Sequence, residues 1–241
     1  MKKGIIGGTG CLKLFEGERQ AVEVTTPYGQ IPLYEINDTL VFLLRHGANH
    51  NIPPHKINYR ANIWALKEVG VEALFGIYAV GSITETLQVG EAALVDQFID
   101  FCGGQRISTF FDEEVTHTPL STPYSARLNH ALIEQAQQLN FPLAQKGVYV
   151  CTNGPRLESA AEIEMFRRWG GDYVGMTASS ETILANELSL EFSAIAYSIN
   201  WATGVKEELS FLPQAQREKL LEKIVHLIVV ADTLPKGIIE R

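Results

Sequence analysis

Two short segments combine residue types that can bind an anion. Gly7-Gly8-Thr9-Gly10 has glycines that let the backbone approach an anion closely, and the Thr9 hydroxyl can donate a hydrogen bond. A plain tight turn is the alternative, because the Lys-Ser/Thr ending of a P-loop and the GxGxxG spacing are both missing. Arg45-His46-Gly47 follows an apolar run and sets a guanidinium beside an imidazole, which suits phosphate or, alternatively, a surface salt bridge. Neither segment decides the ligand alone.

Two further polar side chains stand where apolar runs end. Thr177 precedes the small polar residues of a helix start and is free to meet an anion there, while Ser179 or Ser180 is expected to be the N-cap. Asn200 emerges from the apolar run 195–199, although a turn-forming Asn remains an alternative. Both side chains are candidates for a ligand site.

Glu158 ends the segment Thr152–Glu158, which joins an apolar run to an expected helix. The carboxylate could merely favour the helix macrodipole. It could instead recognise a base, because an ionised carboxylate only accepts hydrogen bonds and so matches the N1–H of a 6-oxopurine but not the bare N1 of adenine. In a different segment, His50 and His55 flank two prolines and have no acidic or cysteine residue at the spacing of a metal site. A rigid loop is therefore favoured over a metal site there.

These residues need a scaffold of alternating strands and helices. Helical spacing joins Tyr59 to Leu66 and Leu221 to Ile228, and helices are also expected at 160–169 and 181–188. This alternation predicts an α/β fold, a single domain over 1–241, with ligands beyond the carboxyl ends of the strands. The segment 105–125 is expected to be irregular. Buried strands are predicted at 4–6, 40–44, 73–80, 93–99, 148–151, 173–176 and 192–199.

Composition excludes several classes of partner. The formal net charge of -8 offers no basic surface for nucleic acid. Three widely spaced cysteines without a CxxC pair argue against a disulfide framework or a structural zinc site, and fit a reducing cytosol. The apolar stretch at the N-terminus is too short for a signal peptide or a membrane span. We therefore expect a cytoplasmic protein with no membrane or nucleic-acid partner.

Together, GIIGGTG, RHG, NGPRLESAAEIEMFRRWGGDYVGMT and SIN followed by Trp201-Ala202 resemble the purine nucleoside phosphorylase and methylthioadenosine phosphorylase family. The resemblance runs from Gly4 to about Val205, and its strongest part is the segment from Glu158 to Thr177. It implies a central mixed β-sheet surrounded by helices, a homotrimer, and no metal or organic cofactor. Inorganic phosphate is the implied co-substrate.

The resemblance also implies roles for individual residues. It places Met176 against the ribose, and His117 in the sugar pocket of the neighbouring subunit. Tyr78 departs from the pattern, because relatives usually have a smaller Thr or Asn there, and it receives no role. Phosphate is expected to contact Thr9, Arg45, His46, Ala79 and Thr177. The base is expected to contact Leu157, Glu158, Asn200 and Ala202, and Trp201 is expected among the other substrate-binding residues.

The chemistry implied is phosphorolysis. The glycosidic bond lengthens first, phosphate stabilises the resulting oxocarbenium-like sugar, and negative charge on the departing purine is dispersed at N7. Asn200 is the candidate for that last task, with His46 as the second catalytic residue at the phosphate.

Donor and acceptor matching favours a 6-oxopurine, because the amide of Asn200 can donate to O6 and accept from N7–H. No histidine occurs between Trp201 and Val225 to bind a 5′-hydroxyl, whereas Leu209, Phe211 and Leu212 offer an apolar contact for a 5′-methylthio group. S-methyl-5′-thioinosine is therefore the expected substrate, followed by inosine or guanosine, then methylthioadenosine. Two functions other than phosphorolysis stay open: a relative that binds nucleosides without turnover, and a dinucleotide-binding domain.

Overall fold

The computed structural model describes residues 1–12, 20–102, 104 and 106–233, without the side chains of Thr9 and Leu12. Its centre is a mixed β-sheet in which strands run in the order β2-β3-β4-β1-β5-β10-β9-β7, while β11 pairs with β5 and β6, and β6 pairs with β8. The strands are β1 (Lys3–Gly7), β2 (Gln20–Thr26), β3 (Gly29–Asn37), β4 (Leu40–Leu44), β5 (Ala73–Ser82), β6 (Ala92–Leu94), β7 (Gln97–Phe101), β8 (Leu143–Ala144), β9 (Val148–Thr152), β10 (Tyr173–Gly175) and β11 (Glu191–Trp201).

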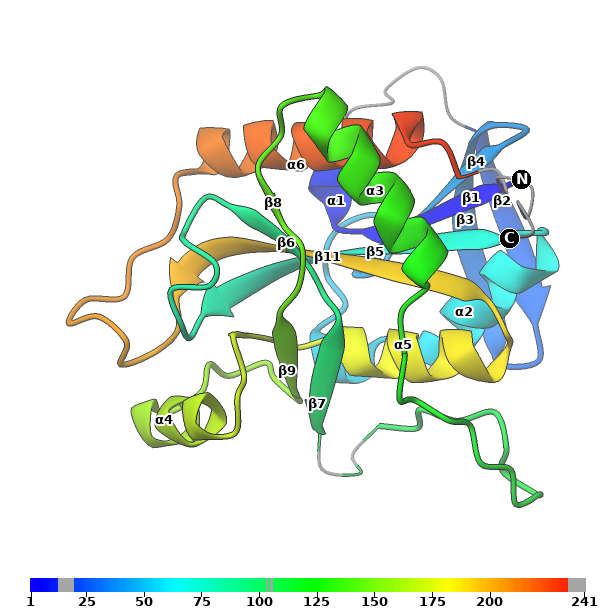
Figure 1. Ribbon diagram of the computed structural model, residues 1–241. Coiled ribbons are helices and arrows are strands. Elements are labelled where there is room, and N and C mark those ends of the chain that lie inside the picture. Colours follow the sequence, from blue (N-terminus) through cyan, green and yellow to red (C-terminus); the bar gives the residue numbers. More distant parts are fainter. Residues whose placement is uncertain (13–19, 103, 105, 234–241) are drawn as a thin grey trace, which may run out of the picture.

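Helices cover both faces of this sheet (Figure 1). α3 and α6 lie on one face and α2 and α5 on the other, so that each face has its own buried apolar cluster. This arrangement confirms the predicted α/β fold with a central mixed sheet surrounded by helices. The helices are α1 (Thr9–Leu12), the 3-10 turn η2 (Pro54–Lys56), α2 (Tyr59–Glu68), α3 (Ala126–Gln138), α4 (Ala160–Arg168), α5 (Ala178–Glu187) and α6 (Gln214–Val230).

Four neighbouring strands, β4, β1, β5 and β11, are parallel and mostly apolar. β1 pairs in parallel with β4 and β5, and β5 pairs in parallel with β11. Such strands are covered on both faces, which explains the continuous apolar runs seen in the sequence. The hairpin of β2 and β3 gave no such run, because it pairs antiparallel at the edge of the sheet and many of its side chains are exposed.

The predicted strand over 93–99 is wrong, because two strands occupy that stretch. β6 ends at Leu94 and pairs with β11, whereas β7 begins at Gln97 and pairs with β9. Between them, Asp96 donates its backbone N–H to the carbonyl of Gly147 and accepts the backbone N–H of Gly147 on its side chain. The chain thus changes partner at a polar residue inside an apolar run.

The predicted N-cap of α5 is also wrong. Ser179 and Ser180 lie inside the first turn, and Thr177 is the N-cap, although its side chain makes no capping hydrogen bond. α4 has the more usual start, in which the Ser159 hydroxyl accepts from the backbone of Glu162 and the Glu162 carboxylate accepts from the backbone of Ser159.

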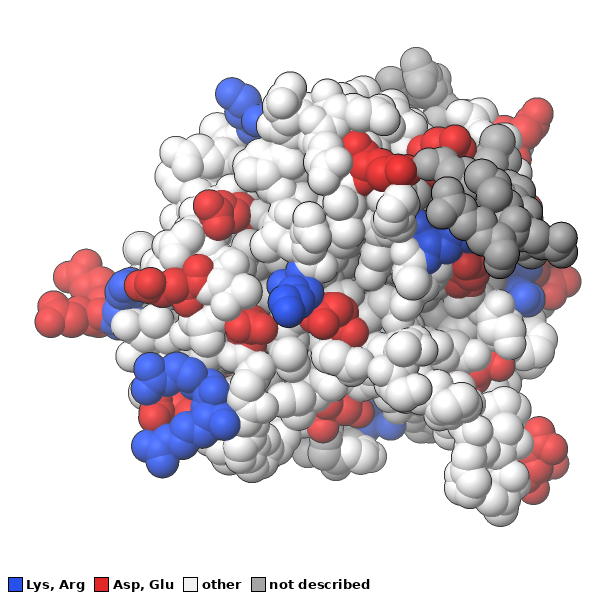
Figure 2. Space-filling view, viewed as in Figure 1, with Lys and Arg blue, Asp and Glu red and all other residues white. Residues whose placement is uncertain are grey.

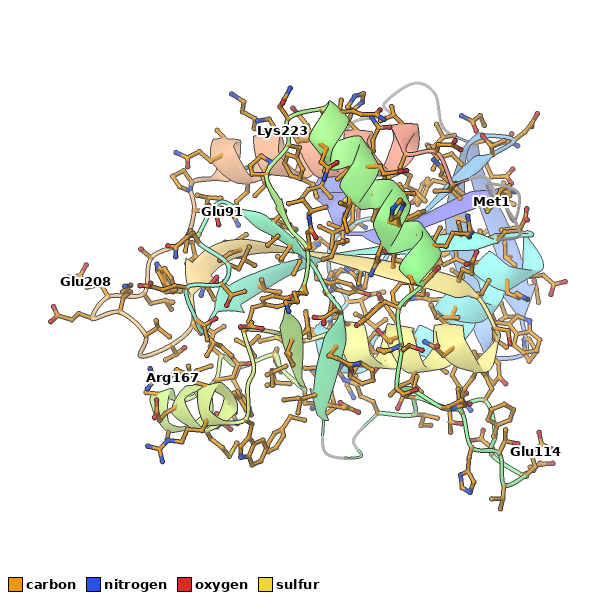
Figure 3. All side chains as sticks on the ribbon, in the orientation of Figure 1. Met1, Glu91, Glu114, Arg167, Glu208 and Lys223 are labelled. Atoms are coloured by element: carbon orange, nitrogen blue, oxygen red, sulfur yellow. The ribbon has the colours of Figure 1, made fainter. Side chains whose placement is uncertain are left out.

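Charged residues of both signs are mixed over the face seen in Figure 2, and the basic residues at its lower left belong to the end of α4. The described residues between 104 and 125 form no helix or strand, and the stretch around Glu114 projects from the body in Figure 3. None of the helices in the described ranges is long and apolar enough to cross a membrane.

Candidate active site

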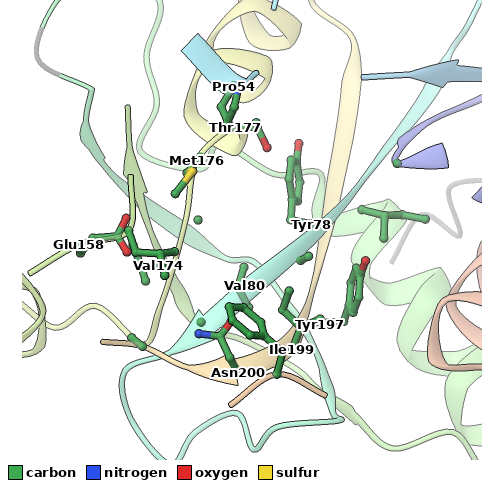
Figure 4. Close-up of a pocket in the computed structure, with 18 of the residues that line it drawn as sticks. Pro54, Tyr78, Val80, Glu158, Val174, Met176, Thr177, Tyr197, Ile199 and Asn200 are labelled. Atoms are coloured by element: carbon green, nitrogen blue, oxygen red, sulfur yellow. The ribbon is translucent and has the colours of Figure 1, made fainter. Parts of the chain in front are cut away.

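A cavity of about 280 Å3 lies at the carboxyl ends of β1, β4, β5, β10 and β11. This is where ligands bind in open α/β sheets. In Figure 4, Tyr78 and Thr177 lie at one end of the cavity and Asn200 at the other. The predicted residues that line it are Arg45, His46, Ala79, Leu157, Glu158, Met176, Thr177, Asn200 and Ala202.

Arg45 leaves the end of β4 and enters the cavity as a buried, ion-paired residue. Its Nε and Nη2 donate to the two carboxylate oxygens of Glu181, at 2.6 and 2.9 Å, and its Nη1 donates to the carbonyl of Ile77 at 3.0 Å. The Arg45 side chain is 4% exposed and that of Glu181 is 0% exposed. Burial alone would lower the pKa of Arg45, but the Glu181 carboxylate outweighs it and raises that pKa, so the guanidinium stays charged.

The start of α5 lies at the same end, where the backbone N–H of Thr177 donates to the Tyr149 hydroxyl at 3.4 Å and the Thr177 side chain makes no capping hydrogen bond. Thr177 is buried and lines the cavity, together with Gly8 from the loop after β1. The first backbone N–H groups of a helix have no partner within the helix and favour an anion. The Thr9 side chain lies outside the described residues, so its predicted contact with phosphate stays a prediction.

His46 is held in one tautomer by its neighbour. Its Nδ1 lies 2.8 Å from the carbonyl of Ile52, which can only accept, so a neutral ring carries its proton on Nδ1 and leaves Nε2 as an acceptor. Burial, followed by the positive charge of Arg45, lowers the pKa of His46. His46 is therefore a weak base beside the end of the cavity that contains Arg45 and Thr177, which we call the anion end. The centres of the His46 and His50 rings are 4.8 Å apart.

Glu158 lines the other part of the cavity and is 6% exposed. Its Oε1 accepts from the Thr152 hydroxyl at 2.5 Å, which fixes the carboxylate while Oε2 has no bond to another described residue. The segment between them is held by Arg106, whose Nε and Nη2 donate to the side-chain and backbone oxygens of Asn153. A hydrogen-bond acceptor is thus presented to the cavity on a fixed loop.

Asn200 reaches the cavity because β11 is irregular there. The register against β5 shifts between Ser198 and Asn200, and Ile199 and Asn200 both line the cavity as a result. Asn200 donates one N–H to the carbonyl of Trp201 at 2.7 Å, which leaves its second N–H and its carbonyl oxygen for a ligand. The same irregularity turns Trp201 out of the cavity into a separate groove, where Lys206 lies over its ring.

Met176 borders the cavity between these two ends. Gly154 has a positive φ of 61°, and a Cβ there would meet the Met176 sulfur at 2.5 Å, so only glycine lets the loop approach so closely. Phe211 lines the cavity and is 49% exposed, whereas its neighbour Leu212 does not line it. His117 is exposed on the projecting segment and lies outside this cavity.

Sequence reasoning missed four contributors to the site and its supporting loop: Glu181, Tyr78, Tyr197 and Arg106. Glu181 and Tyr78 surround Arg45, and Tyr197 lines the cavity with a hydroxyl whose pKa burial raises to about 12. Glu181 lies in α5, a helix whose residues are mostly buried, and a buried charge requires a partner. The sequence does not show that this helix is buried. Arg106 was missed because it stands in an irregular segment that has no pattern of its own.

One group of potential metal ligands occurs in the described part of the chain. One ligand atom each from Asp100, Cys102 and Cys151 lies within 4.8 Å of the others. An oxygen of Asp100 already accepts from the backbone of Cys102 and from the Ser179 hydroxyl, and the two thiols lie 3.7 Å apart in a hydrogen bond. These contacts explain the group as an internal network, so it assigns no metal.

The sequence matches the model of one protein family over residues 2–231, and that family is described as the phosphorylase superfamily. The chain belongs to the phosphorylase superfamily. This result agrees with the resemblance drawn from the motifs, and the matching region includes every residue that lines the cavity.

Two curated relatives are similar over most of their length. A protein of Thermodesulfovibrio yellowstonii named "Probable S-methyl-5′-thioinosine phosphorylase" is 40% identical over 213 residues, covering 86% of this chain and 80% of that protein. A 6-oxopurine nucleoside phosphorylase of Pyrococcus furiosus is 41% identical over 240 residues, covering 94% of this chain and 90% of that protein.

A solved structure shows the same fold. The methylthioadenosine phosphorylase of Schistosoma mansoni, in its apo form, superposes with a TM-score of 0.86 at 29% identity, covering 95% of this chain and 89% of that chain. Relatives named for 6-oxopurine and for adenine nucleosides therefore share this architecture, and the side chains of the cavity must distinguish the bases.

Proposed function

We propose that this chain catalyses the phosphorolysis of a purine nucleoside, with S-methyl-5′-thioinosine as the preferred substrate. The observation that carries the proposal is one cavity with two unlike ends. Arg45 and the N-terminus of α5 offer donors at one end, and Glu158 and Asn200 offer an acceptor and an amide elsewhere in the same cavity. A phosphate and a base can thus bind on either side of one sugar.

Base choice follows from the donors and acceptors. The ionised carboxylate of Glu158 accepts from the N1–H of hypoxanthine and has nothing to offer the bare N1 of adenine. The second N–H and the carbonyl oxygen of Asn200 match O6 and N7–H of the same base. Leaving a buried polar group unpaired costs about 1–3 kcal/mol, which supports selection of a 6-oxopurine over adenine.

The 5′ end of the sugar is proposed to lie against apolar side chains. Ile199 and Phe211 line the cavity, and they suit a methylthio group better than a hydroxyl. Inosine or guanosine phosphorolysis is the runner-up, because the hydroxyl of Tyr197 also borders the cavity and could bind a 5′-hydroxyl.

The proposed reaction breaks the bond between C1′ and N9 and forms a bond between C1′ and a phosphate oxygen. The bonding electrons leave with the purine, and Asn200 stabilises their charge through N7. Phosphate stabilises the cationic sugar from the anion end, where the guanidinium of Arg45, the Thr177 hydroxyl and the positive end of the α5 dipole hold it. The products are hypoxanthine and 5-methylthioribose 1-phosphate.

We also propose a cytoplasmic homotrimer that needs no metal or organic cofactor, and in which His117 reaches the sugar pocket of a neighbouring subunit. The exposure of His117 on a projecting segment is compatible with that role. Light scattering tests the assembly, since a fully active monomer would remove the shared site.

The decisive test of the function is an assay with and without inorganic phosphate on methylthioinosine, inosine, guanosine and methylthioadenosine. We expect phosphate-dependent release of hypoxanthine, fastest from methylthioinosine, with a sugar 1-phosphate as second product. Binding of nucleosides without cleavage would support a relative that has lost turnover, and cleavage independent of phosphate would indicate a hydrolase.

A further inference from the structure

Tyr78 takes part in a buried network at the anion end of the cavity. Its hydroxyl donates to Oε2 of Glu181 at 2.6 Å, and the guanidinium of Arg45 lies over its ring at 4.5 Å from the ring centre. Tyr78 is 1% exposed and lines the cavity. The hydroxyl therefore binds the same carboxylate that holds Arg45.

The backbone is shaped to accept a tyrosine at this position. Gly76 precedes Tyr78 by two residues on the same face of β5, and a Cβ on Gly76 would meet the Tyr78 hydroxyl oxygen at 2.3 Å. The ring lies back over this glycine and packs edge-on against Tyr149, with 5.6 Å between ring centres. A smaller side chain could not reach Glu181 from this strand.

The network leaves one N–H group of Arg45 without a hydrogen-bond partner among the described residues. Four contacts use its N–H groups, two to Glu181 and one each to the carbonyls of Ile77 and Ile6, and an arginine side chain has five such groups. Among the described residues, the remaining N–H at Nη1 has no acceptor. Arg45 lines the cavity, so a rotation of the guanidinium would change where that N–H points.

The negative charge of Glu181 explains why its carboxylate needs the hydrogen bond from Tyr78. A bare carboxylate beside an anion subsite would repel phosphate and could draw the free N–H of Arg45 to itself. The Tyr78 hydroxyl instead occupies a lone pair of Oε2, so that Glu181 binds Arg45 through both oxygens in one geometry.

We propose that Tyr78 is a positioning residue for the anion subsite: its hydroxyl anchors Glu181, and Glu181 fixes Arg45 so that one N–H faces a bound phosphate. The inference rests on the proposed function only in taking phosphate as the anion. Tyr78 acts through Glu181 and need not touch the substrate.

Tyr78→Phe tests this directly, because it keeps the ring beneath Arg45 and over Gly76 and removes only the hydroxyl. We expect the KM for phosphate to rise about tenfold, the size of one charge-assisted hydrogen bond, with the KM for the nucleoside changed less than about twofold. An unchanged phosphate KM in the folded variant, or equal rises in both KM values, would overturn the inference.

Tyr173→Phe is the matched control. Tyr173 is also fully buried, and its hydroxyl donates to the carbonyl of Leu94 at 3.2 Å, with no contact to Arg45 or Glu181. We expect its phosphate KM to match wild type. A rise as large as that of Tyr78→Phe would attribute both effects to general loosening and contradict a positioning role.

Glu181→Gln keeps the inference testable if Tyr78→Phe does not fold. Positioning predicts a weaker phosphate interaction, whereas a carboxylate that merely repels phosphate predicts a tighter one. Where both variants fold, the double variant should be no worse than Glu181→Gln alone, because Tyr78 acts through Glu181. Additive losses would show that Tyr78 acts independently and would contradict the proposal.

Thermal stabilisation by inorganic phosphate alone separates this inference from the proposed function. If phosphate neither stabilises the wild-type protein nor supports cleavage, the function is wrong. If phosphate stabilises wild type and Tyr78→Phe equally, the function stands and only the role of Tyr78 is wrong.

Discussion

The two ends of the cavity are held in place by different means. At the anion end, Arg45 and Glu181 are 136 positions apart and meet as a buried ion pair between the end of β4 and α5. At the base end, Glu158 is held by Thr152 six positions away, and Asn200 by the carbonyl of the next residue. The anion end therefore depends on a contact between distant elements, whereas each base-end side chain is held directly by a residue close in sequence, with Arg106 bracing the loop before Glu158.

This difference separates stability from specificity. Substitutions at the anion end should disturb folding and phosphate binding together, because they uncover a buried charge. Substitutions at the base end should change substrate preference with little loss of stability. Each of the following experiments can break or sharpen that contrast.

The largest effect is expected for Arg45→Ala, which leaves the fully buried Glu181 without its cation. We expect the free energy of unfolding to fall by about 3–5 kcal/mol, measured by chemical denaturation. Arg168→Ala is the control, since the pair of Arg168 with Glu164 is exposed to solvent and should contribute little to stability. Equal losses from the two variants would remove the special status of the anion end.

Glu158→Gln should act on the base without affecting the fold. The amide oxygen can still accept from Thr152, while the charge that matches N1–H is lost. We expect kcat/KM for methylthioinosine to fall about 10- to 100-fold, with the free energy of unfolding changed by less than about 1 kcal/mol. A loss of stability as large as that of Arg45→Ala would erase the contrast between the two ends.

Phe211→Ala probes the 5′ end of the sugar. Phe211 is about half exposed, so we expect no unfolding but a loss of preference for methylthioinosine over inosine of about tenfold in kcat/KM. Leu212→Ala, a neighbour that does not line the cavity, should leave the preference unchanged. A larger change from the Leu212 variant would place the 5′ end of the sugar against Leu212 instead of Phe211.

The smallest effect concerns His46 and pH. Because the pKa of His46 lies below its usual value, the ring is neutral near pH 7 and gains a proton, and with it an Nε2–H donor, only as pH falls through that lowered pKa. Phosphate affinity should therefore rise a few-fold between about pH 7.5 and about 5.5. Calorimetry on wild type and His46→Gln isolates this effect, since the ionisation of phosphate is common to both experiments. Identical pH profiles would exclude His46.

The contrast also explains what the sequence could predict. The central strands were recognisable from their apolar runs. The base-end residues were recognisable from local motifs, such as the loop that contains Glu158 and the end of the apolar run that precedes Asn200. Trp201 was expected to bind substrate, and the shift in register that places it outside the cavity leaves no mark in the sequence. The edge hairpin β2–β3 was missed because half-exposed strands lack a continuous apolar run.

The partner of Arg45 was beyond sequence reasoning for a physical reason. Guanidinium beside imidazole indicates an oxyanion, but the same pattern serves a buried salt bridge, and only the packing of α5 against the sheet brings Glu181 to Arg45. The residue set aside for departing from the family pattern, Tyr78, completes that arrangement.

The most direct test of the account is the ratio of kcat/KM for methylthioinosine to that for methylthioadenosine, measured in wild type and in Asn200→Asp. We predict that wild type prefers methylthioinosine, and that the variant loses most of this preference because a carboxylate facing O6 opposes acceptor with acceptor. Glu158 still faces the bare N1 of adenine in the variant, so loss of methylthioinosine activity should exceed any gain with methylthioadenosine. A wild type that prefers methylthioadenosine, or a ratio that Asn200→Asp leaves unchanged, would contradict selection of the base by Glu158 and Asn200.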